Sequence, residues 1–369
     1  HNTRSFAMTE QSHRRRRLVA LAKLSLAVGI LGYLVYRLRG EDVFQRFLQE
    51  PKNWSLLGIA QLVVATAFSL SFIRWYLLVR ALGLEFHLRD AFRLGSLGFM
   101  LNQVSLGSIG GDFFKAVCVA REFPGKRTEA VATVFVDRVV GLYAMIIVAL
   151  CGAMLAWSTV SNHPTLRALA TVVAAAGFLG TIGVAVLMTH AATGPAVRNR
   201  VAQIPVAGHT LARLVAAAAV YRERRRYVVA ATGIACCTHT LLLLGFWIIG
   251  RGLPGYAPPL SQMCLVAPMS MVAGALPLTP AGLGTFETAM EFLYRTVGAR
   301  DGDGTLAAIT YRVMTYVFAS IGAVYYISAR GKVDRLLHDA EDLADELDAE
   351  EIRDCDVNRN AAAPSVEPA

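Results

Sequence analysis

Charged residues are scarce in this sequence. Of its 369 residues, 17% are charged and 55% are hydrophobic, and the mean hydropathy is +0.46. Ordinary soluble domains carry roughly 25% charged residues, so this composition lies outside their range. Several apolar segments reach the roughly 20 residues that a helix needs to cross a bilayer, and they lack the alternating pattern of a membrane β-barrel. We therefore expect an all-α integral membrane protein.

Metal-binding spacings and catalytic motifs are also missing. The six cysteines show no CxxC spacing, so we expect them to be small buried hydrophobic residues rather than disulfides or metal ligands. The sequence has no HExxH, GxSxG or Walker motif and no paired aspartates of a metal-dependent glycosyltransferase. These absences predict no catalytic residues, no metal, no cofactor and a protein that is not an enzyme.

Basic residues give a net charge of +9. They cluster in loops beside apolar segments, which is typical of membrane orientation and does not indicate nucleic-acid binding. The pattern predicts a multi-pass protein of the cytoplasmic membrane with both termini in the cytoplasm. Residues 1–17 form a basic N-terminus, residues 18–330 a transmembrane domain, and residues 331–369 an acidic cytoplasmic tail.

The transmembrane domain contains two kinds of apolar segment. Two regions, 91–118 and 260–297, are interrupted near the middle by Gly or Pro, and each predicts a re-entrant hairpin or two tilted short helices. With an inside start, the two hairpins enter from opposite faces. Six other segments are long enough for full transmembrane helices: 18–36, 54–79, 130–157, 168–190, 227–250 and 305–327.

The two interrupted regions resemble each other. Gly111 and Phe113 match Gly284 and Phe286 at an offset of 173, and a helix with Arg138 aligns with one carrying Arg312 at an offset of 174. The chain therefore reads as repeat A (about 54–157), a linker helix (168–190) and repeat B (about 227–327). Because one helix separates the copies, the second is predicted to be inverted relative to the first, as in many secondary transporters.

Polar residues at the interruptions need a polar environment. A helix that begins inside the bilayer presents free N–H groups and a partial positive charge, and anions are the natural occupants. Charged residues at mid-helix cost roughly 2.5–3.5 kcal/mol on insertion scales, so Asp137, Arg138 and Arg312 should have partners or a function. One reading is that Arg138 pairs with Asp112 and Arg312 with Glu287 only to lock the hairpins; head-group binding or proton relay is the other, and the two are compatible.

Other polar residues receive simpler interpretations. Arg74 lies near a span end and is expected to extend toward the membrane surface. His239, among apolar residues, is expected to be a hydrogen-bonded packing residue. Asn102 is expected to satisfy backbone groups at the first hairpin tip.

Two signature regions carry a family resemblance. The stretch "NQVSLGSIGGDFFKA" with "DRVVGLY", and then "LPLTPAGLGTFE", resembles the flippase-like transmembrane region of lysylphosphatidylglycerol synthases, the multiple peptide resistance factors. Asp112 stands where many members carry Glu, and Lys115 where they often carry Arg. Full-length synthases append a cytosolic aminoacyl-transferase domain. Residues 331–369 are too short for such a domain, so we do not expect synthase activity from this chain.

The resemblance implies lipid handling. The expected function is binding an anionic phospholipid or lipid-linked intermediate and translocating it between leaflets, with membrane lipids as partners and homo-oligomerisation left open. A membrane-embedded enzyme or enzyme subunit acting on a lipid-linked sugar, and a small-solute or ion transporter, remain alternatives. The expected head-group site comprises Gly110, Gly111, Asp112, Lys115, Asp137, Arg138, Gly282, Gly284, Glu287 and Arg312, with support from Asn102, Thr279, Pro280 and Glu291.

Overall fold

The computed structural model describes residues 47, 49–104, 110–123, 127–190, 193–202, 208–275, 279 and 283–328. Within these residues the regular secondary structure is helical. The predicted span 18–36, the basic N-terminus 1–17 and the acidic tail 331–369 lie outside the described residues.

In the part of the chain that the structure describes, five helices are long and apolar enough to cross a membrane. They agree with five of the six predicted spans, and the sixth prediction falls on the undescribed segment 18–36. The chain is therefore a multi-pass helical membrane protein. The five are α3 (Trp54–Ala81), α6 (Arg127–Leu155), α8 (Pro164–Leu187), α11 (Arg225–Gly252) and α14 (Asp303–Ser328).

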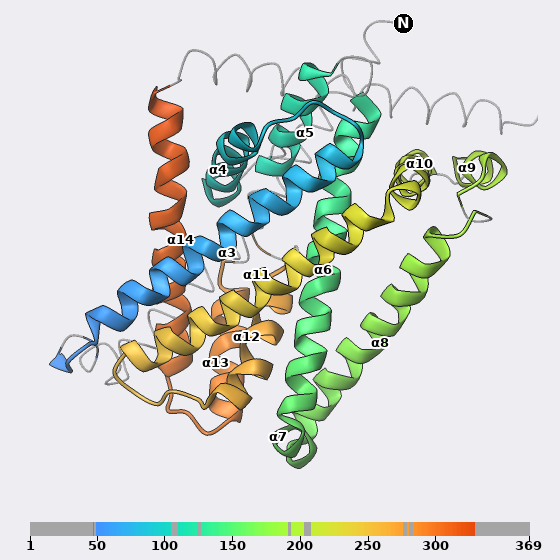
Figure 1. Ribbon diagram of the computed structural model, residues 1–369. Helices are drawn as coiled ribbons and strands as arrows, with labels where there is room; N and C mark the ends of the chain where they lie inside the picture. Colours follow the sequence, from blue (N-terminus) through green and yellow to red (C-terminus); the bar gives the residue numbers. More distant parts are fainter. Residues whose placement is uncertain are drawn as a thin grey trace, which may run out of the picture.

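Each interrupted region forms two short helices, as the glycines and prolines predicted. The first pair is α4 (Leu88–Val104) and α5 (Gly111–Glu122), and the second is α12 (Leu260–Ala275) and α13 (Thr285–Thr296). The first pair lies toward the top of Figure 1 and the second toward the bottom, so the two pairs lie toward opposite ends of the molecule.

The described part of the chain also contains three short helices that were not predicted from the sequence. They are α7 (Trp157–Asn162), α9 (Pro195–Ala202) and α10 (Gly208–Glu223). The segment that holds α9 and α10 read as an arginine-rich loop, but Tyr221 of α10 is buried and its hydroxyl donates to the Leu78 carbonyl oxygen at 3.0 Å. This contact fastens α10 to the end of α3.

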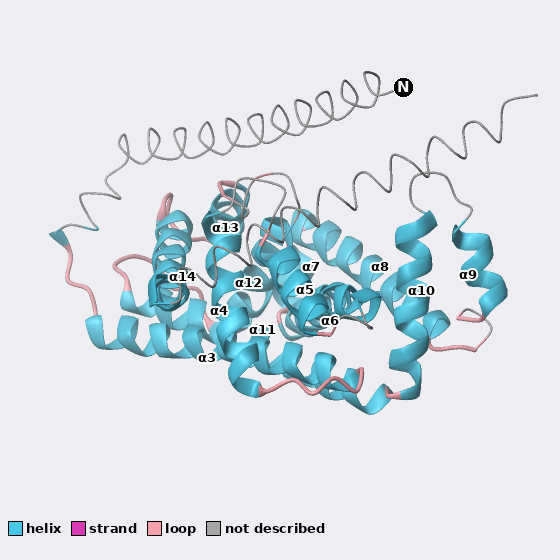
Figure 2. Ribbon diagram, turned by 90° about the horizontal axis from the view of Figure 1, so that it is seen from above, coloured by secondary structure: helices cyan, strands magenta, loops and turns pink. Residues whose placement is uncertain are grey.

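Helices α3 and α11 lie side by side and antiparallel along one face (Figures 1 and 2). At one end, the Asn53 N–H before α3 donates to the Gly252 carbonyl oxygen of α11 at 3.0 Å. At the other end, Arg224 before α11 lies close to Gly83 after α3. The Asn53 side chain also begins α3, because its Oδ1 accepts from the Leu56 N–H at 3.1 Å.

Two glycines allow long helices to cross short ones closely. A Cβ atom at Gly152 of α6 would lie 1.8 Å from the Cys264 carbonyl oxygen of α12. A Cβ atom at Gly322 of α14 would lie 2.3 Å from the Ser96 carbonyl oxygen of α4. Such small-residue contacts are the usual way for membrane helices to pack, because lipid supplies no hydrophobic drive between them.

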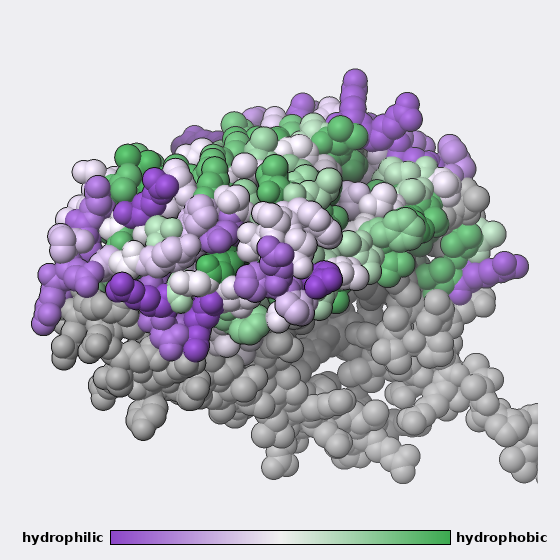
Figure 3. Space-filling model, turned by 90° about the horizontal axis from the view of Figure 1, so that it is seen from below, coloured by the Kyte–Doolittle hydropathy of each residue, from purple (hydrophilic) through white to green (hydrophobic). Residues whose placement is uncertain are grey.

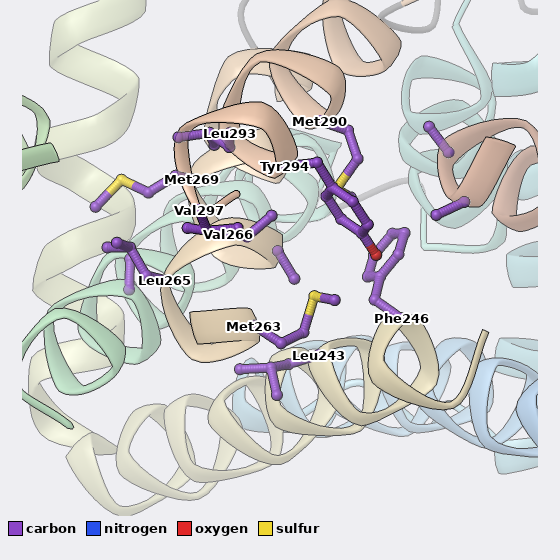
Figure 4. Packing of buried hydrophobic residues seen from close by; sticks show 14 of the residues in the cluster. Leu243, Phe246, Met263, Leu265, Val266, Met269, Met290, Leu293, Tyr294 and Val297 are labelled. Carbon is purple, nitrogen blue, oxygen red and sulfur yellow. The ribbon is translucent and has the colours of Figure 1, made fainter. Parts of the chain in front are cut away.

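Among the described residues, the largest buried hydrophobic cluster joins α3, α6, α7, α8, α11, α12, α13 and α14. Figure 4 shows part of it, with Met263 and Val266 of α12 lying between Leu243 and Phe246 of α11 and Leu293 and Tyr294 of α13. This packing holds the second short-helix pair against the bundle.

Large apolar side chains also lie on the outside. On α8 they include Phe178 (68% exposed) and Leu179 (66%), and on α14 they include Val324 (64%). Such faces suit contact with acyl chains. Seen from the end at the bottom of Figure 1, hydrophilic side chains gather toward the rim, with hydrophobic ones between them (Figure 3).

Candidate functional site

The first polar cluster lies where α5 meets α6. Asp112, in the first turn of α5, forms ion pairs with Lys115 one turn along and with Arg138 of α6, and the Lys115 pair is 2.7 Å long. Lys115 is held from its other side by the Trp75 ring of α3, with the ammonium 5.1 Å from the ring centroid. The predicted Asp112–Arg138 pair is therefore present, and one carboxylate serves two cations.

Exposure differs sharply within this cluster. The Lys115 side chain is 11% exposed and the Asp112 side chain 19%, whereas Arg138 is 67% exposed. One negative and two positive groups leave the cluster with one net positive charge, and the Arg138 guanidinium is its most exposed member. Such a group is well placed to bind an anion by charge-assisted hydrogen bonds.

The start of α5 is built by close backbone contact and a side-chain cap. A Cβ atom at Gly111 would lie 1.7 Å from the Gly98 carbonyl oxygen of α4, so only glycine fits there. Gly110 stands at the N-cap position in extended conformation, and the Gly111 N–H donates to Asn102 Oδ1 at 2.8 Å. Asn102 is thus the backbone-satisfying residue that the sequence predicted, and the Gly111 amide is not bare.

The second polar cluster lies where α13 meets α14. Arg312 donates to Glu287 Oε1 from Nε at 2.8 Å and from Nη2 at 2.6 Å. The Glu287 side chain is 3% exposed and the Arg312 side chain 13%, so this pair is buried. The predicted Glu287–Arg312 pair is therefore present, and unlike the first cluster it balances its charges.

Glu287 also caps its own helix. Its Oε2 accepts from the Gly284 N–H at 2.7 Å, and Gly284 has a φ of 84°, in the left-handed region that favours glycine. The sequence reasoning expected this amide to be free for an anionic guest, which is wrong for the Gly284 N–H. A carboxylate at the third helical position reaches back to the amide before the helix, a common capping arrangement.

The expectations for Arg74 and Asp137 were wrong, because these two residues pair with each other. Arg74 does not extend to the membrane surface: it is buried, and its Nε and Nη2 donate to Asp137 Oδ1 and Oδ2 at 2.7 and 3.0 Å. Asp137 was grouped with Arg138 in the site, yet adjacent helical residues point about 100° apart, and here they bind different partners. His239 Nε2 hydrogen-bonds the Gly141 carbonyl at 3.0 Å, the packing role expected of it.

The residues that were expected to support the head-group site have different roles in the structure. Glu291 accepts from the Gly302 and Thr305 N–H groups at 2.7 and 2.8 Å, so it caps the start of α14. Thr279 Oγ1 lies 3.4 Å from Thr285 Oγ1 beside the second cluster. Pro280 and Gly282 lie outside the described residues.

Aromatic residues around the cations were missed by the sequence reasoning. Trp75 lies against Lys115, and the Phe286 ring centroid lies 5.8 Å from the Arg312 guanidinium carbon. Tyr311 packs on Phe286 with ring centroids 5.7 Å apart. The available signal was the position of Phe286 and Tyr311 next to the charged residues Glu287 and Arg312 in sequence. Within the described residues, no group of three or more His, Cys, Asp or Glu side chains is placed to hold a metal ion.

The fold and the two clusters define a class: a helical multi-pass membrane protein with an Arg–carboxylate cluster at each of two short-helix pairs. The sequence model of the family described as "Lysylphosphatidylglycerol synthase TM region" matches residues 20–323. The chain therefore belongs to this family, which relates it to membrane proteins of lipid modification or flipping. A comparison with curated proteins gave no match.

Proposed function

We propose that α3–α6 and α11–α14 are two inverted copies of one unit. The equivalent helices α3 and α11 lie antiparallel, and the two short-helix pairs lie toward opposite ends of the molecule. Each copy bonds an arginine of its last helix to a carboxylate of its second short helix. The glycine crossings also correspond, because the last helix of each copy packs on the first short helix of the other.

On this basis we propose that the protein binds an anionic phospholipid, or a lipid-linked intermediate, and translocates it between the leaflets of the cytoplasmic membrane. The observation that carries the proposal is the outward-facing Arg138 in a cluster with one excess positive charge. A phosphate neutralises that charge. In the second cluster, where the charges balance, a lipid phosphate competes with Glu287 for Arg312. The two clusters therefore differ in their affinity for the phosphate.

The two clusters give alternating access a physical basis. In inverted-repeat transporters the substrate site is formed by interrupted helices from both halves, and one half rocks against the other around it. The proposed orientation places the short pair α4 and α5 at the cytoplasmic side. It follows from the basic segments around residues 121–127 and 222–226 and from the positive-inside rule.

Reconstitution into vesicles tests this function. Leaflet exchange of labelled phosphatidylglycerol and phosphatidylcholine is measured for the unaltered protein and for Arg138→Ala and Arg312→Ala. Loss of a charge-assisted phosphate contact is expected to slow exchange of the anionic lipid about tenfold or more. The matched control is Arg295→Ala, because Arg295 pairs with Asp301 at 2.7 Å at the far end of α13.

The alternatives predict different results. Turnover of a lipid-linked sugar by the purified protein would favour a membrane-embedded enzyme. Flux of a small anion without lipid exchange would favour a solute transporter. If Arg138→Ala and Arg312→Ala exchange lipid as fast as Arg295→Ala, the head-group site is wrong.

A further inference from the structure

A groove of about 650 Å³ lies between α3, α4 and α14, apart from both polar clusters. Its volume falls within the roughly 300–1,000 Å³ of typical ligand sites. Most of the lining is apolar, with Phe72 of α3, Phe92 of α4, and Phe318 and Ile321 of α14. Phe92 is 36% exposed and Ile321 55% exposed, so the groove opens on the outer surface where lipid lies.

Glycines set the shape of this groove. Gly95 of α4 lets Phe72 form the floor, because a Cβ atom there would lie 2.6 Å from Phe72 Cδ1. Gly322 lets α14 approach the Ser96 backbone and form the second wall. Phe72 then contacts Phe92 edge-on, with ring centroids 5.7 Å apart, and Phe318 at 6.0 Å. The groove is thus held open by packed rings.

One end of the groove is positively charged. Arg89 and Arg93 line it at the start of α4, and the Arg93 guanidinium lies 5.9 Å from the centroid of Tyr325. Asp90 lies between them in sequence and 3.8 Å from Arg93, which leaves one excess positive charge. Within the described residues, Arg89 has no ion-pair partner.

The charged and apolar parts of the groove are arranged like the phosphate and the acyl chain of a phospholipid. Helices α4 and α14 run antiparallel here, since Arg93 lies by Tyr325, Ser96 by Gly322 and Phe99 by Phe318. From Leu88 to Ser96 the groove runs along α4 for about 12 Å. Arg89 and Arg93 lie near the start of α4, where Tyr325 near the end of α14 meets Arg93. Phe72 packs at Gly95 and Phe318 at Phe99, which are further along α4, whereas Phe92 lies between the two arginines in sequence.

We propose that this groove binds one glycerophospholipid of the surrounding membrane, with an acyl chain on Phe72, Phe92 and Phe318 and the phosphate on Arg89 and Arg93. This site is separate from Arg138 and Arg312 and does not depend on translocation. It recognises the phosphate and the chain, which phospholipids of different head groups share. Helix α4 connects it to the first cluster, because the same helix ends at the Asn102 cap of α5.

Native mass spectrometry of the full chain, purified in detergent with phosphatidylglycerol or diacylglycerol added, tests this site. Retention of one phosphatidylglycerol and no diacylglycerol is expected. Arg89→Gln with Arg93→Gln should lower phosphatidylglycerol retention about thirtyfold, since each basic residue near a membrane surface strengthens the attraction to anionic lipid about fivefold. Ile321→Trp should lower phosphatidylglycerol retention, because the larger side chain narrows the part of the groove that holds the acyl chain.

The control is Arg225→Gln with Arg226→Gln, which removes two exposed arginines at the start of α11, outside the groove. It should retain lipid like the unaltered protein, and thermal unfolding confirms that each variant is folded. Equal retention of diacylglycerol, equal loss in the control, or unchanged retention in both groove variants would overturn the site. So would crosslinking that places residues 18–36 in the groove. Leaflet exchange is measured on the same variants. Loss of lipid binding in the groove is thereby distinguished from loss of translocation at Arg138 and Arg312.

Discussion

Arg74 of α3 and Asp137 of α6 form a closed, two-pronged ion pair inside the bundle, with donor–acceptor distances of 2.7 and 3.0 Å. Their side chains are 10% and 9% exposed. Gly141, one turn beyond Asp137, makes room for this guanidinium, because a Cβ atom there would lie 3.1 Å from Arg74 Nη1. The pair joins α3 and α6 in the interior of the bundle, where both side chains are largely shielded from water.

Breaking this pair should destabilise the protein strongly. Asp137→Asn leaves the buried Arg74 charge uncompensated, which typically costs about 3–5 kcal/mol. Replacing both residues, with Arg74→Leu and Asp137→Leu, removes both charges and should recover a large part of that loss. Thermal and denaturant unfolding in detergent measure the effect. If the double variant loses as much stability, relative to the unaltered protein, as Arg74→Leu and Asp137→Leu lose together as single variants, the residues are not coupled.

Gly111 should tolerate no side chain. Gly111→Ala places a methyl group against the Gly98 carbonyl oxygen and must separate α4 from α5, which also pulls the Gly111 N–H from Asn102. We expect a loss of stability of about 1–3 kcal/mol, typical of overpacking, and slowed lipid exchange. The control is Gly233→Ala on α11, where the new methyl group meets nothing within 4 Å. That change should be neutral or slightly stabilising, since alanine favours helix.

Lengths of the long helices could be predicted from the sequence. Segment 54–79 became Trp54–Ala81 and segment 227–250 became Arg225–Gly252, because bilayer thickness fixes the number of apolar residues in a span. The pairs Asp112–Arg138 and Glu287–Arg312 could be predicted too, because a charge inside a membrane needs a partner. Helices α9 and α10 were missed because both are too short to cross a membrane and their segment is rich in arginine, although α10 carries an apolar stretch from Leu214 to Tyr221.

Rotation of helices about their axes could not be predicted. The partner of Arg74 depends on which face of α3 meets α6, and no local pattern in one helix specifies that. Occupation of the Gly111 amide by Asn102 depends on how α4 folds back on α5, nine residues away in sequence. The Gly284 amide was different, because Glu287 stands three residues beyond it and this spacing is a recognisable capping signal.

Two functions of Glu287 should separate on substitution. Glu287→Gln keeps an oxygen for the Gly284 N–H but loses the charge that pairs with Arg312, whereas Glu287→Ala loses both. Loss of a cap alone costs about 0.5–2 kcal/mol, so Ala should be less stable than Gln by about that amount. Both variants remove the carboxylate charge that pairs with Arg312 and should alter lipid exchange. Equal stability of the two variants would show that the cap contributes nothing.

Glu291 should act on stability and leave transport intact. Glu291→Ala removes the acceptor of the Gly302 and Thr305 N–H groups at the start of α14, and Thr305 Oγ1 also donates to it at 3.0 Å. We expect a loss of about 1–3 kcal/mol from the unsatisfied buried groups. Exchange of phosphatidylglycerol per folded molecule should match the unaltered protein. A specific loss of exchange, with stability retained, would place Glu291 in the head-group site instead.

The two glycine crossings give the inverted arrangement its own test. Gly152→Ala should push α6 from the Cys264 backbone of α12, and Gly322→Ala should push α14 from the Ser96 backbone of α4. If the copies are equivalent, each change should destabilise the protein by a similar amount, about 1–3 kcal/mol, and slow exchange in both directions. Gly183→Ala on α8 is the control, because a methyl group there meets nothing within 4 Å. A large effect from one crossing and none from the other would contradict the equivalence of the two copies. Two crossings related by two-fold symmetry should contribute equally to stability and to exchange.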